Sequence, residues 1–369
     1  MKKFRAAVIG GGHLGRIHAR LLKSNPLARL VAICDPQPLA QQAAINEFNI
    51  RAVSDYRKIV DEIDVAVIAT PSFQHAEIAR DLIARGKHLL IEKPVTVEAK
   101  DARELAKLAR EKCICVQVGH VERFNPAIQK AQETVGTPKY IEASRQSGFT
   151  YRSTDIGVVH DLMIHDIDLV CQMFSGHLVS AHSIGMAIIG NLEDMAQVRL
   201  EFSCGGVANL TASRCSFTPE RTFKVFGTKG FASVDLAKHV VTSVQVPHWV
   251  ANREFDFLAA SDEQKSFVRE HLFTDILKKS EVEVAPLNAI EAEQTDWLEA
   301  IRDFRDPLVT IEQAARNVDI AAQIVEQINE HSWSQKSKGM VGPLASPSPK
   351  DLNRDKMPDQ LRTQRSKAA

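Results

Sequence analysis

Three glycines near the start of the chain have the spacing of a phosphate-binding turn. Gly10, Gly12 and Gly15 fit the pattern G-x-G-x-x-G and lie between a strand-like apolar run and a helix-like stretch. In that context the three glycines permit, in turn, a tight turn, the close approach of a pyrophosphate and the close packing of helix on strand. The helix start, at His13 and Leu14, offers free N–H groups to phosphate oxygens. The pattern predicts a dinucleotide-binding site.

An acidic residue indicates which dinucleotide the turn binds. Asp35 closes the second strand-like run, where a carboxylate accepts hydrogen bonds from the adenosine ribose and repels a 2′-phosphate. Residues 36–38 include no Arg or Lys to neutralise such a phosphate. We therefore expect NAD as the cofactor, with NADP the less favoured choice. The alternative is a glycine-rich structural turn followed by an incidental aspartate.

Two more segments follow strand-like runs and are expected near the nicotinamide half of the cofactor. In doubly wound sheets the ligand lies beyond the carboxyl ends of the strands. Thr70 and Pro71 follow one run, with His75 beginning the next helix, and Glu92 and Lys93 follow another. We expect all five to border the cofactor. For Lys93 alone, the alternative is a solvated surface charge.

The first predicted helix contains two histidines, His13 and His18. We expect their side chains to lie on the helix surface and not to act as ligands.

A second cluster has the residue types that proton transfer needs. Asp161 and His165 are four residues apart in a predicted helix spanning about residues 157–173, so their side chains share a face. A carboxylate at that spacing orients an imidazole and stabilises its charged form. Oxidation of an alcohol requires a group that removes the hydroxyl proton while hydride leaves the same carbon. The alternative is a polar helix face without a catalytic role.

The elements that position these residues alternate up to about residue 120. Near-continuous Val, Ile and Leu runs separated by helical patterns predict a parallel sheet covered on both faces, an α/β Rossmann domain over residues 1–120. The predicted strands are 4–9, 28–34, 65–69, 88–91 and 113–118, and the predicted helices end near 24, 48, 84 and 111.

Strand then follows strand, which predicts an α+β second domain over residues 121–332 with a large, open, mainly antiparallel sheet. Its predicted strands are 140–145, 179–186, 196–202, 207–213, 222–226 and 231–236, and helical spacing returns at 289–329. The remaining residues, 333–369, are rich in Ser, Pro, Lys and Arg, with eight basic and three acidic residues from Lys336 onward. We expect a disordered basic tail there; docking of that tail on an acidic partner is the alternative.

Composition excludes several classes of protein. Lys plus Arg (46) balances Asp plus Glu (46), so no overall basic field favours nucleic acid or a membrane surface. No apolar run approaches the roughly 18 residues that span a membrane. The six cysteines show no metal-ligand spacing, and Cys113 and Cys115 are expected on one face of a buried strand. We expect a soluble cytoplasmic protein without a signal peptide, disulfides or a metal site.

Together these motifs resemble the glucose-fructose oxidoreductase, inositol dehydrogenase and rhizopine-catabolism (Gfo/Idh/MocA) family. The resemblance spans about residues 4–330. Four features carry it: the glycine turn, Glu-Lys-Pro at 92–94, the Asp-xxx-His-Asp-x-Asp segment at 161–168, and the turn at 225–235 between two strands.

The resemblance implies a nicotinamide-dependent oxidoreductase acting on a sugar, cyclitol or nucleotide sugar held between the two domains. In the family pattern Lys93 hydrogen-bonds the reacting hydroxyl, His165 is the acid/base and Asp161 is its partner. Some relatives carry Tyr in place of His165 and hold their cofactor tightly, so the histidine points to ordinary dehydrogenase behaviour. A homo-oligomer, dimer or tetramer, through the second-domain sheet is also implied.

Within the family, the run 155–168 looks most like that of UDP-N-acetylglucosamine 3-dehydrogenases. Arg123 and Arg152 are then candidates for binding the substrate diphosphate, the alternative for each being a surface arginine. Two other functions stay open: an inositol or free-sugar dehydrogenase, and a non-catalytic NAD-binding redox sensor or regulator.

Overall fold

A parallel sheet of six strands forms the first part of the computed structural model, which describes residues 3–150, 155–189, 191–285, 287–334 and 337–338. The strand order is β3-β2-β1-β4-β5-β6, and every neighbouring pair is parallel, as the alternating pattern predicts. The strands are β1 (Phe4–Ile9), β2 (Ala28–Cys34), β3 (Arg51–Val53), β4 (Val65–Ile68), β5 (His88–Ile91) and β6 (Val116–Val118).

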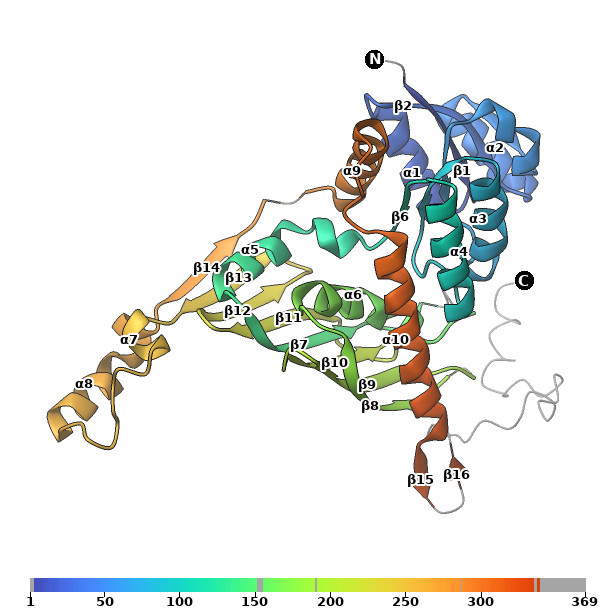
Figure 1. Ribbon diagram of the computed structural model, residues 1–369. Coiled ribbons are helices and arrows are strands. Elements are labelled where there is room, and N and C mark those ends of the chain that lie inside the picture. The colour runs from blue at the N-terminus through green and yellow to red at the C-terminus, as the bar shows by residue number, and fades with distance from the viewer. Residues whose placement is uncertain (1–2, 151–154, 190, 286, 335–336, 339–369) are drawn as a thin grey trace, which may run out of the picture.

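Helices cover both faces of this sheet, which is why its central strands read as unbroken apolar runs (Figure 1). α1 (His13–Ser24) and α2 (Pro38–Phe48) pack on one face; α3 (His75–Ala84) and α4 (Ala99–Glu111) pack on the other. Short 3-10 turns are η1 (Tyr56–Lys58), η2 (Val60–Glu62), η3 (Ser72–Gln74) and η4 (Val121–Phe124).

The second sheet has eight strands and confirms the predicted mainly antiparallel architecture. Its order is β14-β13-β12-β11-β7-β10-β9-β8, and only the central pair β7 and β10 is parallel. The strands are β7 (Pro138–Gln146), β8 (Leu178–Met186), β9 (Met195–Phe202), β10 (Val207–Ser213), β11 (Glu220–Gly227), β12 (Gly230–Asp235), β13 (Val240–Gln245) and β14 (Lys279–Glu283).

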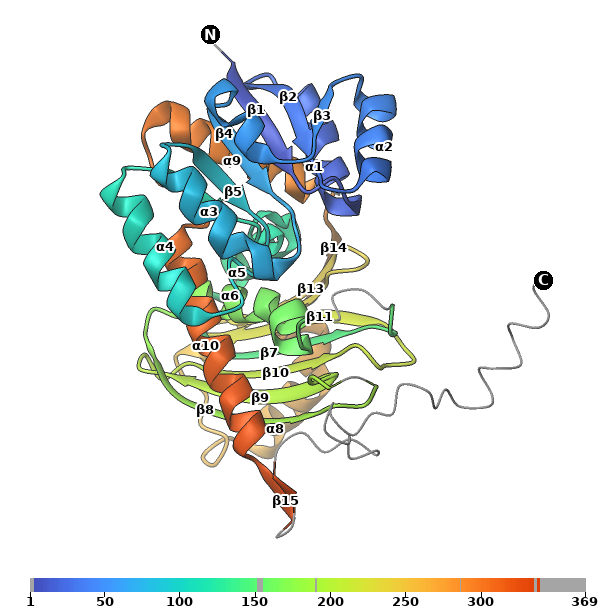
Figure 2. The same ribbon diagram turned by 90° about the vertical axis from the view of Figure 1, so that its right-hand side faces the viewer.

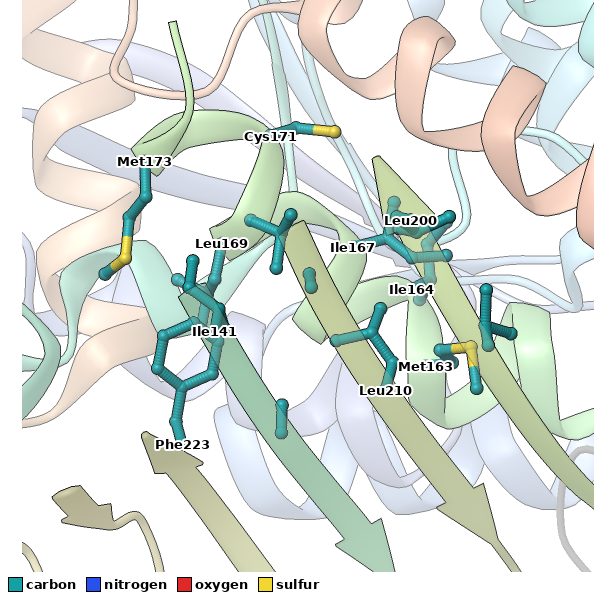
Figure 3. Packing of buried hydrophobic residues seen from close by; sticks show 14 of the residues in the cluster. Ile141, Met163, Ile164, Ile167, Leu169, Cys171, Met173, Leu200, Leu210 and Phe223 are labelled. Atoms are coloured by element: carbon teal, nitrogen blue, oxygen red, sulfur yellow. The ribbon is translucent and has the colours of Figure 1, made fainter. Parts of the chain in front are cut away.

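One face of the second sheet, here called the inner face, is covered by helices and faces the first domain (Figure 2). These helices are α5 (Pro126–Val135) and α6 (Ile164–Met173), with a π-helical turn, η5 (Val159–Met163), directly before α6. Apolar side chains of α6 pack on the strands, as Ile167 does beside Leu200 (Figure 3). Alternation of buried and less buried residues along β7 follows from this one-sided cover.

The last two long helices connect the domains instead of belonging wholly to the second. α9 (Ala289–Asp303) places Trp297 and Leu298 in the core of the first sheet, and α10 (Ile311–Glu330) begins against α4 and ends against β8 (Figure 1). The predicted domain limits assign residues 289–330 to the second domain. In the structure, α9 and the start of α10 pack on the first domain, because their apolar faces complete its hydrophobic core.

An arm extends from the edge of the second sheet between β13 and β14 (Figure 1). It consists of α7 (His248–Ala251), α8 (Asp262–His271) and the π turn η6 (Leu272–Ile276). It exposes several large apolar side chains: Phe257, Leu258, Phe267 and Phe273.

Three expectations about the chain are corrected or limited. The strand predicted at 113–118 is shorter, because Cys113 adopts a left-handed conformation (φ 54°) and ends α4, with Ile114 N–H bonded to Ala109 O. Cys113 is therefore exposed rather than in a buried strand. Two short paired strands, β15 (Ser332–Ser334) and β16 (Ser337–Lys338), stand where the disordered tail was predicted to begin; the rest of that tail lies outside the described residues.

All six cysteines are free thiols. Within the described ranges, no helix combines the length and apolarity needed to cross a bilayer.

Candidate active site

The glycine turn between β1 and α1 has the geometry that phosphate binding requires. Gly10 has φ 104°, and a Cβ there would collide with Ala69 O; a Cβ on Gly15 would collide with Gly10 O. Beside Gly12, by contrast, there is no atom within 4 Å of an added Cβ, so the space in front of the turn is open. The first helical N–H groups, at His13 and Leu14, begin α1 next to this space. The turn therefore fits the pyrophosphate of a dinucleotide.

Asp35 is fixed at the carboxyl end of β2. Its Oδ2 accepts a hydrogen bond from Gly11 N–H (2.7 Å) and its Oδ1 accepts one from Gln37 N–H (2.8 Å). A carboxylate has about four lone-pair positions, so each oxygen keeps one for a ribose hydroxyl. The carboxylate is thus already oriented by the turn that receives the pyrophosphate, and it fits the adenosine ribose of NAD.

Replacing Asp35 with alanine is expected to weaken NAD binding and to reduce discrimination against NADP. Loss of two hydrogen bonds to a charged acceptor raises the dissociation constant for NAD about 10- to 100-fold. The constant for NADP rises less, because the repulsion of its 2′-phosphate is lost as well. Calorimetric titration with both dinucleotides checks this, with Asp61→Ala on the surface as the control. Equal ratios of the two constants in wild type and variant would show that Asp35 does not read the ribose.

Residues at the ends of β4, β5 and β6 surround the same edge of the first sheet. Thr70 and Pro71 follow β4 and Lys93 follows β5. His75 was predicted to border the cofactor, but its ring is buried, with Nδ1 2.9 Å from Pro94 O and Nε2 2.9 Å from Thr70 O. Burial lowers the pKa of His75, while the hydrogen bonds to Pro94 O and Thr70 O act in the opposite direction. The ring lies between the loops that follow β4 and β5 and contacts the main chain of both.

Glu92 is also placed beneath the site rather than in it. Its Oε1 lies 2.6 Å from His18 Nε2, and its Oε2 accepts a hydrogen bond from Lys93 N–H (3.2 Å). Burial alone would raise the pKa of Glu92, but the hydrogen bond and charge of His18, with Lys93, hold it below its ordinary range. The prediction that His18 lies on the helix surface is wrong: its ring is fully buried between Glu92 and Gln294.

A second buried carboxyl group lies close by on α9. Glu293 is fully buried, and neither carboxyl oxygen has a hydrogen-bond partner among the described residues. Burial, and then the negative charge of Glu92, raise the pKa of Glu293 well above its ordinary value. The folded protein therefore keeps a proton that the unfolded chain releases, so stability falls as pH rises above the unfolded-state pKa of Glu293.

Replacing Glu293 with glutamine is expected to remove this pH dependence. The stability of the variant relative to wild type should increase between pH 5 and 8, by at most about 1.4 kcal/mol per pH unit for one proton. Urea unfolding of both proteins at several pH values measures the difference. The exposed Glu291→Gln on the same helix is the control. Parallel curves for wild type and Glu293→Gln would contradict the assignment.

Lys93 meets Asp161 across the domain boundary. Its Nζ donates to Asp161 Oδ1 (3.1 Å) and to the main-chain oxygen of Asp161 (2.6 Å), inside the π-helical turn η5. Two segments predicted to act together are therefore in contact. Asp161 was expected to orient His165, but no hydrogen bond joins the two in the described part of the chain. The Asp161 carboxylate pairs with the Lys93 ammonium instead.

His165, at the start of α6, lies next to this pair. Its ring is partly accessible, but Nδ1 is buried without a hydrogen-bond partner within the described residues. Burial, and then the positive charges of Lys93 and Arg145, lower the pKa of His165 well below 6.5. The imidazole is therefore neutral at neutral pH and able to accept a proton.

A further histidine, His120, completes the group. It follows β6, its ring is buried edge-on to that of His165 with centroids 6.5 Å apart, and burial lowers its pKa. Sequence reasoning missed His120, although the rule that pointed to Lys93 applies to it equally: both residues come directly after a parallel strand.

Two arginines, Arg123 and Arg152, were predicted to bind the substrate. Arg123 is buried, and its Nε and one terminal nitrogen donate to the two oxygens of Asp168 at 2.7 and 2.9 Å. The anion that Arg123 binds is thus a carboxylate of the protein, and we correct its predicted role as a substrate ligand. Arg152 lies outside the described residues. Arg145, which was not singled out, is held in the same way by Asp166.

An open glycine turn, an oriented acidic residue and a lysine–histidine group at one sheet edge define a nicotinamide-dependent oxidoreductase with a Rossmann domain. Residues 4–120 match the model of an oxidoreductase family with an NAD-binding Rossmann fold, and residues 128–233 match the GFO/IDH/MocA C-terminal domain. The chain belongs to the Gfo/Idh/MocA family, and it is an NAD-dependent oxidoreductase of that family.

Curated relatives agree with this assignment. UDP-N-acetylglucosamine 3-dehydrogenase of Acidithiobacillus ferrooxidans is 32% identical over 323 residues, which cover 87% of this chain and 96% of the relative. The scyllo-inositol 2-dehydrogenase (NAD(+)) of Bacillus subtilis is 27% identical over 256 residues, 64% of this chain and 75% of the relative.

Solved structures have the same architecture. That of the A. ferrooxidans UDP-N-acetylglucosamine 3-dehydrogenase superimposes with a TM-score of 0.76 at 30% identity, covering 89% of this chain and 98% of that one. A levoglucosan dehydrogenase in complex with NADH gives 0.75 at 19% identity, covering 88% and 97%, and shows the shared fold.

Proposed function

We propose that this protein oxidises a secondary hydroxyl group of a sugar or nucleotide sugar, and that the substrate is UDP-N-acetylglucosamine, oxidised at C3. The observation that carries the chemistry is the contact between Lys93 and Asp161 beside a neutral His165, at the sheet edge that also carries the glycine turn. The substrate is suggested by the relative that is 32% identical to this chain. The match covers 87% of this chain and 96% of that relative.

NAD, when bound by the glycine turn and Asp35, supplies the acceptor for the hydride. The chain itself provides the proton acceptor and the positive charge. His165, neutral at neutral pH, takes the hydroxyl proton, and the Lys93 ammonium donates a hydrogen bond to the same oxygen as negative charge develops on it. Asp161 holds Lys93 in place from the second domain and keeps its ammonium directed into the site.

The test uses purified protein with NAD and three classes of substrate: UDP-N-acetylglucosamine, free inositols and free hexoses. We expect NADH absorbance to rise with the nucleotide sugar. A rise with inositols alone would favour the second candidate, an inositol dehydrogenase, which the B. subtilis relative suggests. No rise with any substrate would remove the proposed activity.

We also propose a cytoplasmic homo-oligomer, a dimer or tetramer. The face of the second sheet opposite α5 and α6, the outer face, is lined by polar side chains around a hollow of about 990 Å³, which the end of α10 also borders. The arm adds exposed apolar side chains at the edge of the same sheet. Light scattering on the eluting protein measures the assembly, and a monomer would contradict this proposal.

A further inference from the structure

Arg221, at the start of β11, lies on the inner face of the second sheet. Side chains alternate between faces along a strand, and Phe223 and Val225 are buried in the core under α6. Arg221 is two residues before Phe223 and therefore faces the same side. It is in register with Arg145 on β7, whose guanidinium binds Asp166 of α6. This places Arg221 at the border of the site that contains His165.

Among the described residues, Arg221 differs from the other cations around the site in having no side-chain partner. Within the described ranges it makes no ion pair and its side chain makes no hydrogen bond, and it is exposed. Its neighbour Glu220 is turned to the outer face, where it binds Ser144 and Gln146. The paired cations are Lys93 with Asp161, Arg123 with Asp168, Arg145 with Asp166 and Glu122, and Arg214 with Asp194.

The fold gives Arg221 no direct partner at this position among the described residues. Directly opposite it on β7 is Arg145, whose guanidinium already binds Glu122 and Asp166. Arg221 is near enough to act on Asp166 through its charge, but its own N–H donors stay free for a ligand.

We propose that Arg221 binds the phosphate groups of the substrate, and so selects a nucleoside-diphosphate sugar over a neutral sugar. This inference rests on the proposed function and assigns its substrate class to a residue. A guanidinium presents two parallel N–H donors that match phosphate oxygens. A nucleotide sugar carries its diphosphate on C1, two carbons from C3, so an anion site adjoining the acid/base group suits it.

The electrostatics of the site agree with this placement. The positive charge of Arg221 contributes to lowering the pKa of His165, after burial, Lys93, Arg145 and His120. It also acts on the buried Asp166, the residue that follows His165 in α6. Arg221 is therefore close enough for its charge to be felt by both groups without forming a contact that would occupy its donors.

The experiment measures binding of UDP to the full-length protein saturated with NAD, in wild type, Arg221→Gln and Arg221→Lys. Lys224→Gln, on the same strand but the outer face, removes the same charge and is the control. We expect Arg221→Gln to raise the dissociation constant for UDP about 10- to 100-fold. Arg221→Lys should give an intermediate value, and Lys224→Gln should match wild type. The melting temperature of Arg221→Gln should stay close to that of wild type, because the exposed Arg221 side chain makes no contact with another described residue that the substitution would remove.

Equal UDP affinity in wild type and Arg221→Gln overturns the inference, and so does a wild-type protein that does not bind UDP. If Arg221→Gln loses UDP binding but the wild type does not oxidise UDP-N-acetylglucosamine, the anion site is supported and the proposed reaction is contradicted. Turnover of UDP-N-acetylglucosamine with UDP binding independent of Arg221 would leave the reaction intact and move the anion site elsewhere.

Discussion

Lys93→Met is expected to reduce turnover about 10²- to 10³-fold while NAD binding is unchanged. Methionine preserves much of the length of the side chain but removes the ammonium that pairs with Asp161, and with it the hydrogen bond to the developing alkoxide. Removal of one such donor has an effect of this size in other enzymes. The glycine turn and Asp35, which we expect to bind the dinucleotide, belong to other loops. Steady-state rates and NAD titration of the same preparation measure the two properties separately.

A surface lysine provides the matched control for this substitution. Lys100 is exposed on α4, where its ammonium lies 3.8 Å from Glu104, and Lys100→Met should leave both turnover and NAD binding at wild-type levels. If Lys93→Met keeps full turnover, the ammonium has no part in the chemistry. A wild-type protein that binds NAD but turns over none of the tested substrates would instead favour the redox-sensor alternative, for which Lys93→Met has no activity to lose.

The architecture was predictable because hydrophobic periodicity reports on how each strand is covered. The runs at 65–68 and 88–91 are apolar throughout, since both faces of the first sheet are covered. Along β7 the alternation reveals a sheet with one covered face. The glycine turn was predictable for a similar reason, because steric limits at Gly10 and Gly15 act within a short stretch of chain and leave a local mark in the sequence.

Pairings between distant residues were not predictable from such local patterns. His18 meets Glu92 across 74 residues, and Arg123 meets Asp168 across 45. Nothing in the neighbourhood of His18 or Arg123 indicates that each will be buried against a carboxylate, so both were assigned to surfaces or ligands. The packing of α9 on the first domain was missed for the same reason. Its apolar face is evident in the sequence, but which surface that face packs against depends on the topology of the whole chain.

The contact between Asp161 and Lys93 shows where a local rule is incomplete. Spacing of four residues made Asp161 a natural partner for His165. The π-helical turn and the approach of the first domain bring a stronger competitor, since Lys93 bonds both the carboxylate and the main-chain oxygen of Asp161. As a result Asp161 does not offset the effects that lower the pKa of His165, which are burial first and then the positive charges of Lys93 and Arg145.

His165→Asn is expected to lower kcat/KM about 10²- to 10⁴-fold, the usual contribution of a positioned acid or base. Asparagine retains a polar side chain of smaller size but cannot accept the hydroxyl proton. Wild-type activity should depend on pH in a way that reflects the depressed pKa of His165. A base must be unprotonated to act, so lowering its pKa moves the acid limb of the kcat/KM profile to lower pH.

The profile of the wild type should therefore not fall through protonation of His165 until the pH is below 6.5, the ordinary value for histidine. Rates of NADH formation at saturating NAD, measured from pH 5 to 9, test this, and circular dichroism at each pH confirms that the protein is folded. The residual activity of His165→Asn should lack that acid limb. An acid limb at or above pH 6.5 that disappears in His165→Asn would contradict the lowered pKa of His165, because kcat/KM reports the enzyme before the substrate binds. An acid limb that persists unchanged in the variant would assign proton transfer to another group, and the buried ring of His120, which faces His165 edge-on, is then the next residue to replace.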